Sequence, residues 1–208
     1  MNLFDVYPLS PVTIERAEGC RLWDDQGQEY LDLYGGHAVI SIGHTHPHYV
    51  KRIKDQLDKI AFYSNSVEIP IQQELAKKLG HLSCLHDYQL FLVNSGAEAN
   101  ENAIKMASFA TGKSGFIAFS GAFHGRTSGA VALTDNPKIV APCNAREDFH
   151  ILPWGDIDAV EEALKSNTIA GIIIEGIQGV GGIQVPEPDF LRGISSLAKK
   201  YEAKLILD

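Results

Sequence analysis

Residues 94–100, with the sequence Asn-Ser-Gly-Ala-Glu-Ala-Asn, join an apolar run to an expected helix within three residues. The first N–H groups of a helix lack intrahelical partners, and the helix dipole adds partial positive charge there. Gly96 would let a ligand approach the backbone closely. The segment could therefore bind a phosphate. It could equally be a plain turn with Ser95 as the helix cap.

A second candidate segment is Ser-Gly-Ala-Phe-His-Gly-Arg-Thr, residues 120–127, which directly follows the next expected strand. In parallel sheets, ligands bind outside the carboxyl ends of the strands, so this segment should lie at the ligand-binding edge. Phe123 offers a flat apolar face, and Arg126 could pair with a carboxylate through two hydrogen bonds. The alternative is a surface loop with a solvated Arg126 and a core Phe123.

Two carboxylates follow apolar runs further along the chain. Glu175 comes after such a run and precedes four glycines within residues 176–182, which suits a loop pressed against a ligand or a plain glycine-rich connection. Asp208 follows an apolar run at 205–207 and would need a cationic or hydrogen-bonding partner there. A protonated pyridine nitrogen would serve, as would a salt bridge to an Arg or Lys.

Other polar clusters give weaker signals. Histidines alternate in Gly-His-Thr-His-Pro-His, residues 43–48, without helical ligand spacing or a clear carboxylate partner, so a structural or cofactor-adjacent loop is favoured over a metal site. The three cysteines, Cys20, Cys84 and Cys143, show no metal or redox spacing, which indicates reduced thiols in a cytoplasmic protein.

The elements that position these residues alternate between apolar strands and amphipathic helices, which predicts an α/β fold with a mostly parallel sheet flanked by helices. After a hairpin over 21–33 and a loop over 35–48, the expected helices are 47–60, 71–79 (ended by Gly80), 95–110, 156–166 and 189–201, and the expected strands 89–93, 115–119, 169–174 and 205–207. The predicted domains are an N-terminal arm with part of a small domain over 1–80, and the first part of a large domain over 81–208.

Composition limits the possible partners. The chain has 208 residues, 45% of them apolar and 21% charged, as in ordinary globular proteins. A net charge of −8 makes nucleic acid an improbable partner, and no apolar run approaches the ~20 residues of a membrane span. Because the sequence stops within an apolar run, we expect it to be a fragment of a longer protein.

The ordered motifs resemble the class III aminotransferases, with acetylornithine and succinylornithine aminotransferases as the nearest subgroup. The resemblance covers almost the whole chain and rests on five segments: 43–47 (Gly-His-Thr-His-Pro), 94–100, 123–127 (Phe-His-Gly-Arg-Thr), 175–179 (Glu-Gly-Ile-Gln-Gly) and 205–208 (Leu-Ile-Leu-Asp). It implies a transferase of fold type I that depends on pyridoxal 5'-phosphate, and a homodimer.

The resemblance also implies roles for single residues. Ser95, Gly96 and Ala97 would hold the cofactor phosphate, Phe123 would stack on the pyridine ring, and Asp208 would keep the ring nitrogen protonated. Arg126 would bind the substrate carboxylate. The distal amino group of N-acetylornithine or N-succinylornithine would then pass to 2-oxoglutarate, in arginine biosynthesis.

The sequence departs from the family pattern in two respects. The family usually has Pro and Glu where this chain has Gly176 and Val180, which makes succinylornithine a competitor to acetylornithine. The Schiff-base lysine of the family lies beyond the position of Asp208, so the resemblance places no catalytic lysine in these residues. Two alternatives remain: another ω-aminotransferase of the class, acting on ornithine or 4-aminobutyrate, or a non-catalytic module that keeps the fold.

Overall fold

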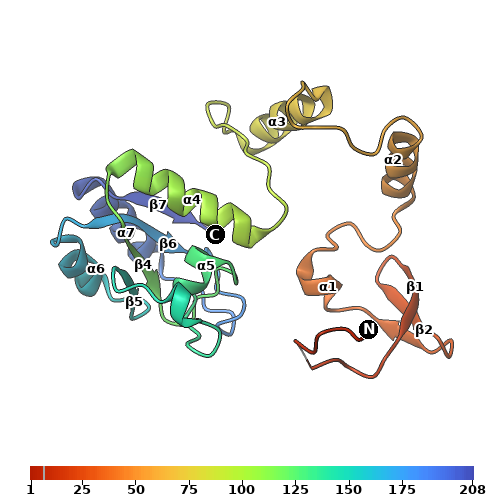
Figure 1. Ribbon diagram of the computed structural model, residues 1–208, viewed down its shortest axis with the longest axis horizontal. Helices are drawn as coiled ribbons and strands as arrows, with labels where there is room; N and C mark the ends of the chain where they lie inside the picture. Colours follow the sequence, from red (N-terminus) through yellow and green to blue (C-terminus); the bar gives the residue numbers. More distant parts are fainter. Residues whose placement is uncertain (7) are drawn as a thin grey trace. The chain divides into compact units, whose positions relative to one another are not determined.

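The computed structural model, which describes residues 1–6 and 8–208, separates the chain into two units, Met1–His86 and Asp87–Asp208 (Figure 1). The domain boundary predicted at residue 80 falls inside helix α3 (Pro70–Ser83), a few residues before this division. The second unit carries all four segments whose chemistry is of interest, so the first unit is described only briefly.

The first unit contains a three-stranded antiparallel sheet in the order β1 (Ile14–Glu18), β2 (Arg21–Asp24), β3 (Glu29–Leu31). Strands β2 and β3 form the predicted hairpin. The Asp24 carboxylate holds the turn, because it accepts hydrogen bonds from the backbone N–H groups of Gln26 and Gln28 and from the Tyr30 hydroxyl. Asp24 is the only buried residue among those described in this unit.

Three helices follow this sheet. Helix α1 (Gly35–Ala38) is a single turn whose residues all have positive φ, within the segment predicted as a loop. Helix α2 (Pro47–Leu57) begins at the predicted proline. Helix α3 (Pro70–Ser83) continues through Gly80, so the prediction that Gly80 ends this helix is wrong. The helix ends instead before Cys84, whose backbone is left-handed.

The second unit is built on a four-stranded parallel sheet in the order β5-β4-β6-β7. Its strands are β4 (Gly115–Phe119), β5 (Phe149–Leu152), β6 (Ile169–Ile174) and β7 (Lys204–Leu207). Strands β4, β6 and β7 confirm three predicted strands, whereas β5 is an addition. Every residue of β4 and β6 is buried, as expected for strands covered on both faces.

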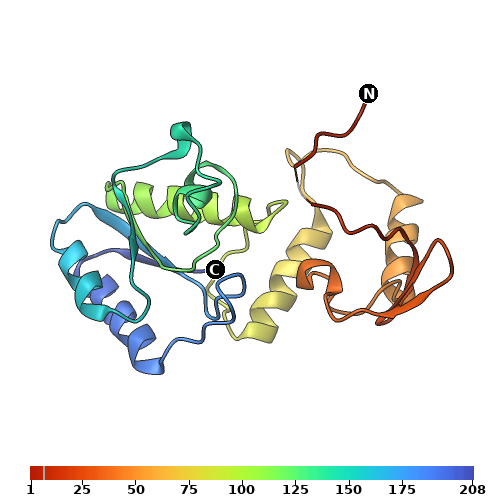
Figure 2. The ribbon, with the colours of Figure 1, turned by 90° about the horizontal axis from the view of Figure 1, so that it is seen from below.

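Helices cover both faces of this sheet (Figure 2). They are α4 (Gly96–Thr111), α5 (Ser128–Ala132), α6 (Ile157–Leu164) and α7 (Pro188–Lys200), and a 3-10 turn η1 spans Pro142–Asn144. Successive residues of β4 point to opposite faces: Ile117 packs in a cluster with residues of α6 and α7, and Phe116 packs in a second cluster with residues of α4. The sheet therefore has one hydrophobic cluster on each face, and both clusters stabilise the strands whose carboxyl ends carry the predicted site residues.

One predicted strand is absent. Residues 89–93 form no strand and pair with no other strand in the described part of the chain, and Leu90, Phe91 and Leu92 are exposed. A strand requires a neighbour for its backbone hydrogen bonds, and an apolar run alone does not supply one. The segment leads into α4 as an extended connection.

Candidate active site

Three neighbouring parallel strands end at one edge of the sheet in the second unit, and each is followed by predicted site residues. Strand β4 leads into residues 120–127, β6 into Glu175, and β7 into Asp208. The chain end at Asp208 lies near the start of α4 in both ribbon views (Figures 1 and 2). The carboxyl edge of the sheet therefore gathers segments that are far apart in the sequence.

The start of α4 presents free backbone donors at this edge. Ser95 is the N-cap, and its hydroxyl oxygen accepts a hydrogen bond from the backbone N–H of Glu98 at 3.2 Å. No described residue accepts a hydrogen bond from the N–H of Gly96 or Ala97. These two N–H groups, together with the helix dipole, can bind an anion. Ser95 is thus the helix cap, which is one of the two roles that its sequence position allowed. The N–H groups of Gly96 and Ala97 still remain able to bind a phosphate.

Glu98 fixes the turn that precedes α4. Its carboxylate accepts hydrogen bonds from the Ser95 hydroxyl at 3.1 Å and from the backbone N–H of Asn94 at 2.9 Å. The hydrogen bonds from Ser95 and Asn94 hold the pKa of the Glu98 carboxyl below its usual range. An ionised carboxylate in the first helical turn also interacts favourably with the dipole. Glu98 therefore stabilises the local backbone of the phosphate-binding candidate.

The loop after β4 packs tightly against the first turn of α4. Gly125 has φ +131°, and a Cβ added there would lie 2.6 Å from the Cβ of Ala97, so no larger residue fits without movement. The Thr127 hydroxyl lies 3.5 Å from the Ala97 carbonyl oxygen. The loop also depends on Glu175, whose carboxylate accepts hydrogen bonds from the backbone N–H groups of Phe123 and Gly179.

His124 and Asp208 form a hydrogen-bonded pair within the site. The His124 Nδ1 lies 2.7 Å from the Asp208 Oδ2, and the His124 side chain has no exposed surface. The side-chain amide of Asn100, on α4, donates to the His124 carbonyl oxygen at 2.8 Å. The predicted need of Asp208 for a polar partner is thus met in part by a histidine, which sequence reasoning did not consider.

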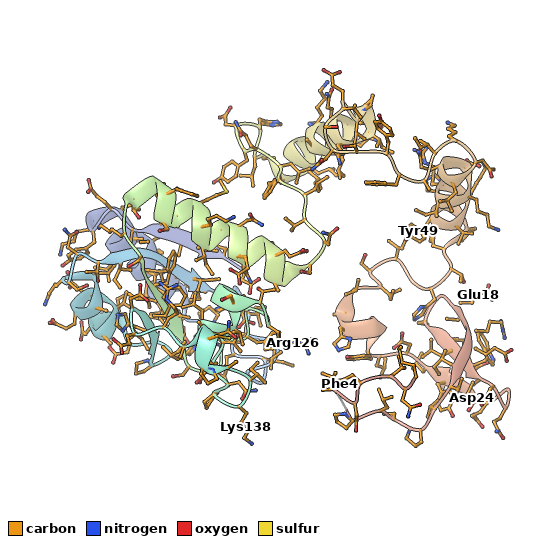
Figure 3. The ribbon with its side chains drawn as sticks, in the orientation of Figure 1. Phe4, Glu18, Asp24, Tyr49, Arg126 and Lys138 are labelled. Carbon is orange, nitrogen blue, oxygen red and sulfur yellow. The ribbon has the colours of Figure 1, made fainter. Side chains whose placement is uncertain are left out.

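A pocket of about 480 Å³ opens where these elements meet, within the 300–1,000 Å³ range that is usual for small-molecule sites. Its lining includes all six of the principal predicted residues, namely Ser95, Gly96, Ala97, Phe123, Arg126 and Asp208. It also includes Asn100, His124, Gly125 and Thr127, which were not predicted as site residues. Figure 3 labels Arg126, which belongs to the loop that follows β4 in the second unit.

Glu175 does not line this pocket. Its carboxylate instead connects the loop after β4 with the glycine-rich loop after β6. Gln178, in the second of these loops, is buried, and its side-chain amide donates to the Ser120 carbonyl oxygen at 3.0 Å. The sequence left open whether Glu175 belongs to a loop pressed against a ligand or to a plain connection, and in the structure its carboxylate holds the loop after β4 that lines the pocket.

The histidine-rich segment does not form a metal centre among the described residues, which contain no group of three potential His, Cys, Asp or Glu ligands. The His44 Nε2 lies 2.7 Å from an oxygen of Asp32, and this carboxylate also accepts hydrogen bonds from two backbone N–H groups. Among residues 1–6 and 8–208, no helix combines the length and the apolar character that a membrane span requires.

Comparison with known sequences shows an extended match. A sequence model of the family described as aminotransferase class-III matches residues 5–208. The acetylornithine aminotransferase of Methanopyrus kandleri is 40% identical over 205 residues, which are 98% of this chain and 52% of that protein.

Solved structures agree with this match. The N-acetylornithine aminotransferase of Stenotrophomonas maltophilia K279a is 32% identical, with a TM-score of 0.78 over 97% of this chain and 51% of that one. The taurine:2-oxoglutarate aminotransferase of Bifidobacterium kashiwanohense, solved with PLP and glutamate, is 25% identical, with a TM-score of 0.90 over 100% of this chain and 52% of that one. These similarities confirm the predicted fold. The chain spans about half the length of each of these three proteins.

Proposed function

Because the chain belongs to the class-III aminotransferases, we propose that the whole protein transfers the distal amino group of N-acetylornithine or N-succinylornithine to 2-oxoglutarate, using pyridoxal 5'-phosphate. The observation that carries this proposal is the single pocket in which free helix-start N–H groups, an aromatic ring and a carboxylate meet. The similarity to acetylornithine aminotransferases supports the choice of substrate.

The residues of the pocket fit the cofactor. The N–H groups of Gly96 and Ala97 would bind the phosphate, and the Ser95 side chain would maintain their orientation by capping the helix. Phe123 would cover one face of the pyridine ring. Asp208 would hold a proton on the ring nitrogen, because a neighbouring carboxylate favours the cationic form. When bound, pyridoxal phosphate supplies an electron sink for the bonds at the substrate carbon.

Arg126 would select and orient the substrates. Its guanidinium can bind the α-carboxylate of an acylornithine with two parallel hydrogen bonds, which would place the distal amine at the reacting centre. None of the described residues lining the pocket is a lysine. We place the lysine that anchors the cofactor after Asp208, as the family resemblance implies.

We further propose the organisation of the whole protein. The second unit would be the first part of the large cofactor-binding domain, and residues 1–80 an arm with part of the small domain. The protein would act as a cytoplasmic homodimer in arginine biosynthesis. Three exposed free cysteines are compatible with a reducing compartment, and light scattering during size-exclusion chromatography would test the dimer.

The activity can be tested with the full-length protein and its cofactor. Glutamate formation from 2-oxoglutarate would be measured with N-acetylornithine, N-succinylornithine, ornithine and 4-aminobutyrate as separate amino donors. We expect the highest kcat/KM with an acylated ornithine. A preference for ornithine or 4-aminobutyrate would assign the protein to another ω-aminotransferase. No turnover with any donor, despite bound cofactor, would overturn the proposal and favour a non-catalytic module.

A further inference from the structure

One face of helix α4 lies along the loop after β4. A Cβ added at Gly125 would lie 2.6 Å from the Cβ of Ala97, and the Asn100 side-chain amide donates to the His124 carbonyl oxygen at 2.8 Å. The α4 residues that lie against the loop and the start of α5 have the spacing of a single helix face, i, i+3, i+4 and i+7: Ala97, Asn100, Glu101 and Ile104. Helix α4 is therefore the surface on which the loop that carries Arg126 is held.

Helix α5 is capped by a side chain from another helix. Its N-cap residue, Thr127, accepts no hydrogen bond from the α5 backbone. The Glu101 carboxylate instead accepts hydrogen bonds from the N–H of Gly129 at 2.6 Å and from the N–H of Ala130 at 3.1 Å. These are the second and third residues of α5, whose N–H groups an N-cap side chain ordinarily satisfies. Glu101 thus supplies from α4 the cap that α5 lacks in its own sequence.

The contact between Glu101 and α5 is close as well as polar. A Cβ added at Gly129 would lie 2.9 Å from the Glu101 Oε2 and 3.4 Å from the Ile104 Cδ1. A side chain at position 129 would therefore displace the carboxylate from the two N–H groups. The glycine allows the first turn of α5 to lie directly on α4.

Arg126 lies between two anchored points of the loop. Gly125, immediately before it, packs on Ala97, and Gly129, three residues after it, is held by Glu101. With both ends of so short a segment held on one helix, the backbone of Arg126 has little freedom to shift. Arg126 lines the pocket, whereas Glu101 does not. Glu101 can therefore affect a bound ligand through the backbone that carries the arginine.

We propose that Glu101 is a positioning residue for Arg126: it holds the first turn of α5 against α4, and thereby sets where the Arg126 guanidinium meets the carboxylate of the amino donor. This inference rests on the proposed function, because it requires a donor whose carboxylate binds Arg126. A small displacement of a binding group is enough to weaken a two-point contact. Loss of Glu101 should therefore impair donors that carry this carboxylate and spare those that lack it.

The test uses the full-length protein with its cofactor and two amino donors. N-acetylornithine carries the α-carboxylate, whereas N-acetyl-1,4-diaminobutane has the same amide and the same distal amine without it. Glu101→Met removes the acceptor at nearly constant length. We expect it to raise the KM for N-acetylornithine about tenfold with a smaller change in kcat, and to leave kcat/KM for the diaminobutane within about twofold. Glu101→Gln keeps an acceptor oxygen and should restore most of the KM.

A second carboxylate provides the matched control. Glu161 accepts hydrogen bonds from the side chains of Lys200 and Tyr201, and so joins α6 to α7 outside the pocket lining. Glu161→Met should leave the kinetics with both donors unchanged. A double-mutant cycle adds a further check, because residues that act through one contact give non-additive effects. In an Arg126→Lys background, Glu101→Met should raise the KM for N-acetylornithine by less than threefold.

The outcomes separate this inference from the proposed function. If the wild-type protein transfers no amino group from an acylated ornithine, the proposed function fails. If it does, and Glu101→Met changes both donors by the same factor or changes neither, the positioning role is wrong while the function stands. Should Glu101→Met not fold, Gly129→Ala decides the question, because alanine suits a helical position and its Cβ displaces the carboxylate. An unchanged KM for N-acetylornithine in Gly129→Ala would overturn the proposal.

Discussion

The Glu175 carboxylate accepts a hydrogen bond from the backbone N–H of Phe123 at 3.0 Å, although the two residues are 52 positions apart. Its other oxygen accepts from the N–H of Gly179 at 3.2 Å. The end of β6 thereby holds the loop after β4, which lines the pocket, and the glycine-rich loop after β6. Because Phe123 lines the pocket and Glu175 does not, the carboxylate would act on a bound ligand only through the backbone of the aromatic residue.

Replacement of Glu175 by Gln should therefore loosen the loops. The Gln amide offers a single acceptor oxygen, so one of the two N–H groups loses its partner. We expect the free energy of unfolding to fall by about 1–2 kcal/mol, as measured by urea denaturation, together with weaker cofactor binding. Glu147→Gln, at an exposed position whose side chain makes no hydrogen bond with the described residues, is the control. Equal effects of the two substitutions would contradict this role of Glu175.

Gly125 should tolerate no side chain. An added Cβ would meet the Cβ of Ala97 at 2.6 Å, and φ +131° is a conformation that L residues rarely adopt. We expect Gly125→Ala to lower the free energy of unfolding by about 3 kcal/mol or more. Gly112→Ala is the matched control, since φ is +69° but no atom lies within 4 Å of the added Cβ, and it should cost about 1 kcal/mol. Similar melting temperatures for both variants would argue against the close contact.

The Glu98 carboxylate predicts a pH dependence of stability. The hydrogen bond from Ser95, followed by that from Asn94, lowers its pKa in the folded protein from the usual value of 4.5. A group whose folded pKa is depressed contributes stability above its unfolded pKa, and this contribution disappears as the pH falls through the folded pKa. Glu98→Gln should thus lower the melting temperature at pH 7 and have less effect as the pH falls below 4.5. If the difference in melting temperature between Glu98→Gln and the wild type stays constant over this range, it would contradict an ionised Glu98 carboxylate in the folded protein.

Local sequence signals predicted much of the second unit. Ser95 before a small-residue turn, Asp156 before an amphipathic stretch, and the apolar runs of β4 and β6 each carry their structural information within a few residues. The strand expected at 89–93 is absent because strand formation depends on a partner elsewhere in the chain. Strand β5 was missed because Phe149–Leu152 is short and includes a histidine.

In the candidate site too, the sequence predicted residues with a local signal and not those whose role depends on a distant partner. Backbone donors and the aromatic residue were found because helix starts and loops after strands have recognisable sequences. His124 stands beside Phe123 in the sequence, yet its importance comes from Asp208, which lies 84 positions later. For Glu175 the sequence left a ligand-facing loop and a plain connection open, and only the fold shows that its carboxylate holds two loops together. Long-range pairing of polar side chains has no local signature.

Gly96 separates ligand binding from folding. A Cβ added at Gly96 would meet no atom within 4 Å, and the residue begins α4 beside the pocket. Gly96→Ala should therefore leave the free energy of unfolding within about 0.5 kcal/mol of wild type. It should still raise the Kd for pyridoxal phosphate roughly fivefold, because the new methyl group keeps the phosphate from the N–H groups. Gly176→Ala, also without neighbours and outside the pocket lining, should change neither quantity in fluorescence titrations.

Arg126 is proposed to bind the carboxylate of the amino donor, and its replacement by Lys tests the geometry of that contact. A lysine keeps the positive charge but cannot form two parallel hydrogen bonds with a carboxylate. We expect the KM for N-acetylornithine to rise roughly tenfold, with a smaller change in kcat. The reason is that the carboxylate contact would stabilise the bound substrate and the transition state about equally. Arg146→Lys, at a surface pair with Asp148, should leave steady-state kinetics unchanged. If Arg126→Lys behaves like that control, the substrate carboxylate is bound by another residue, and the pocket must be assigned a different orientation for the donor.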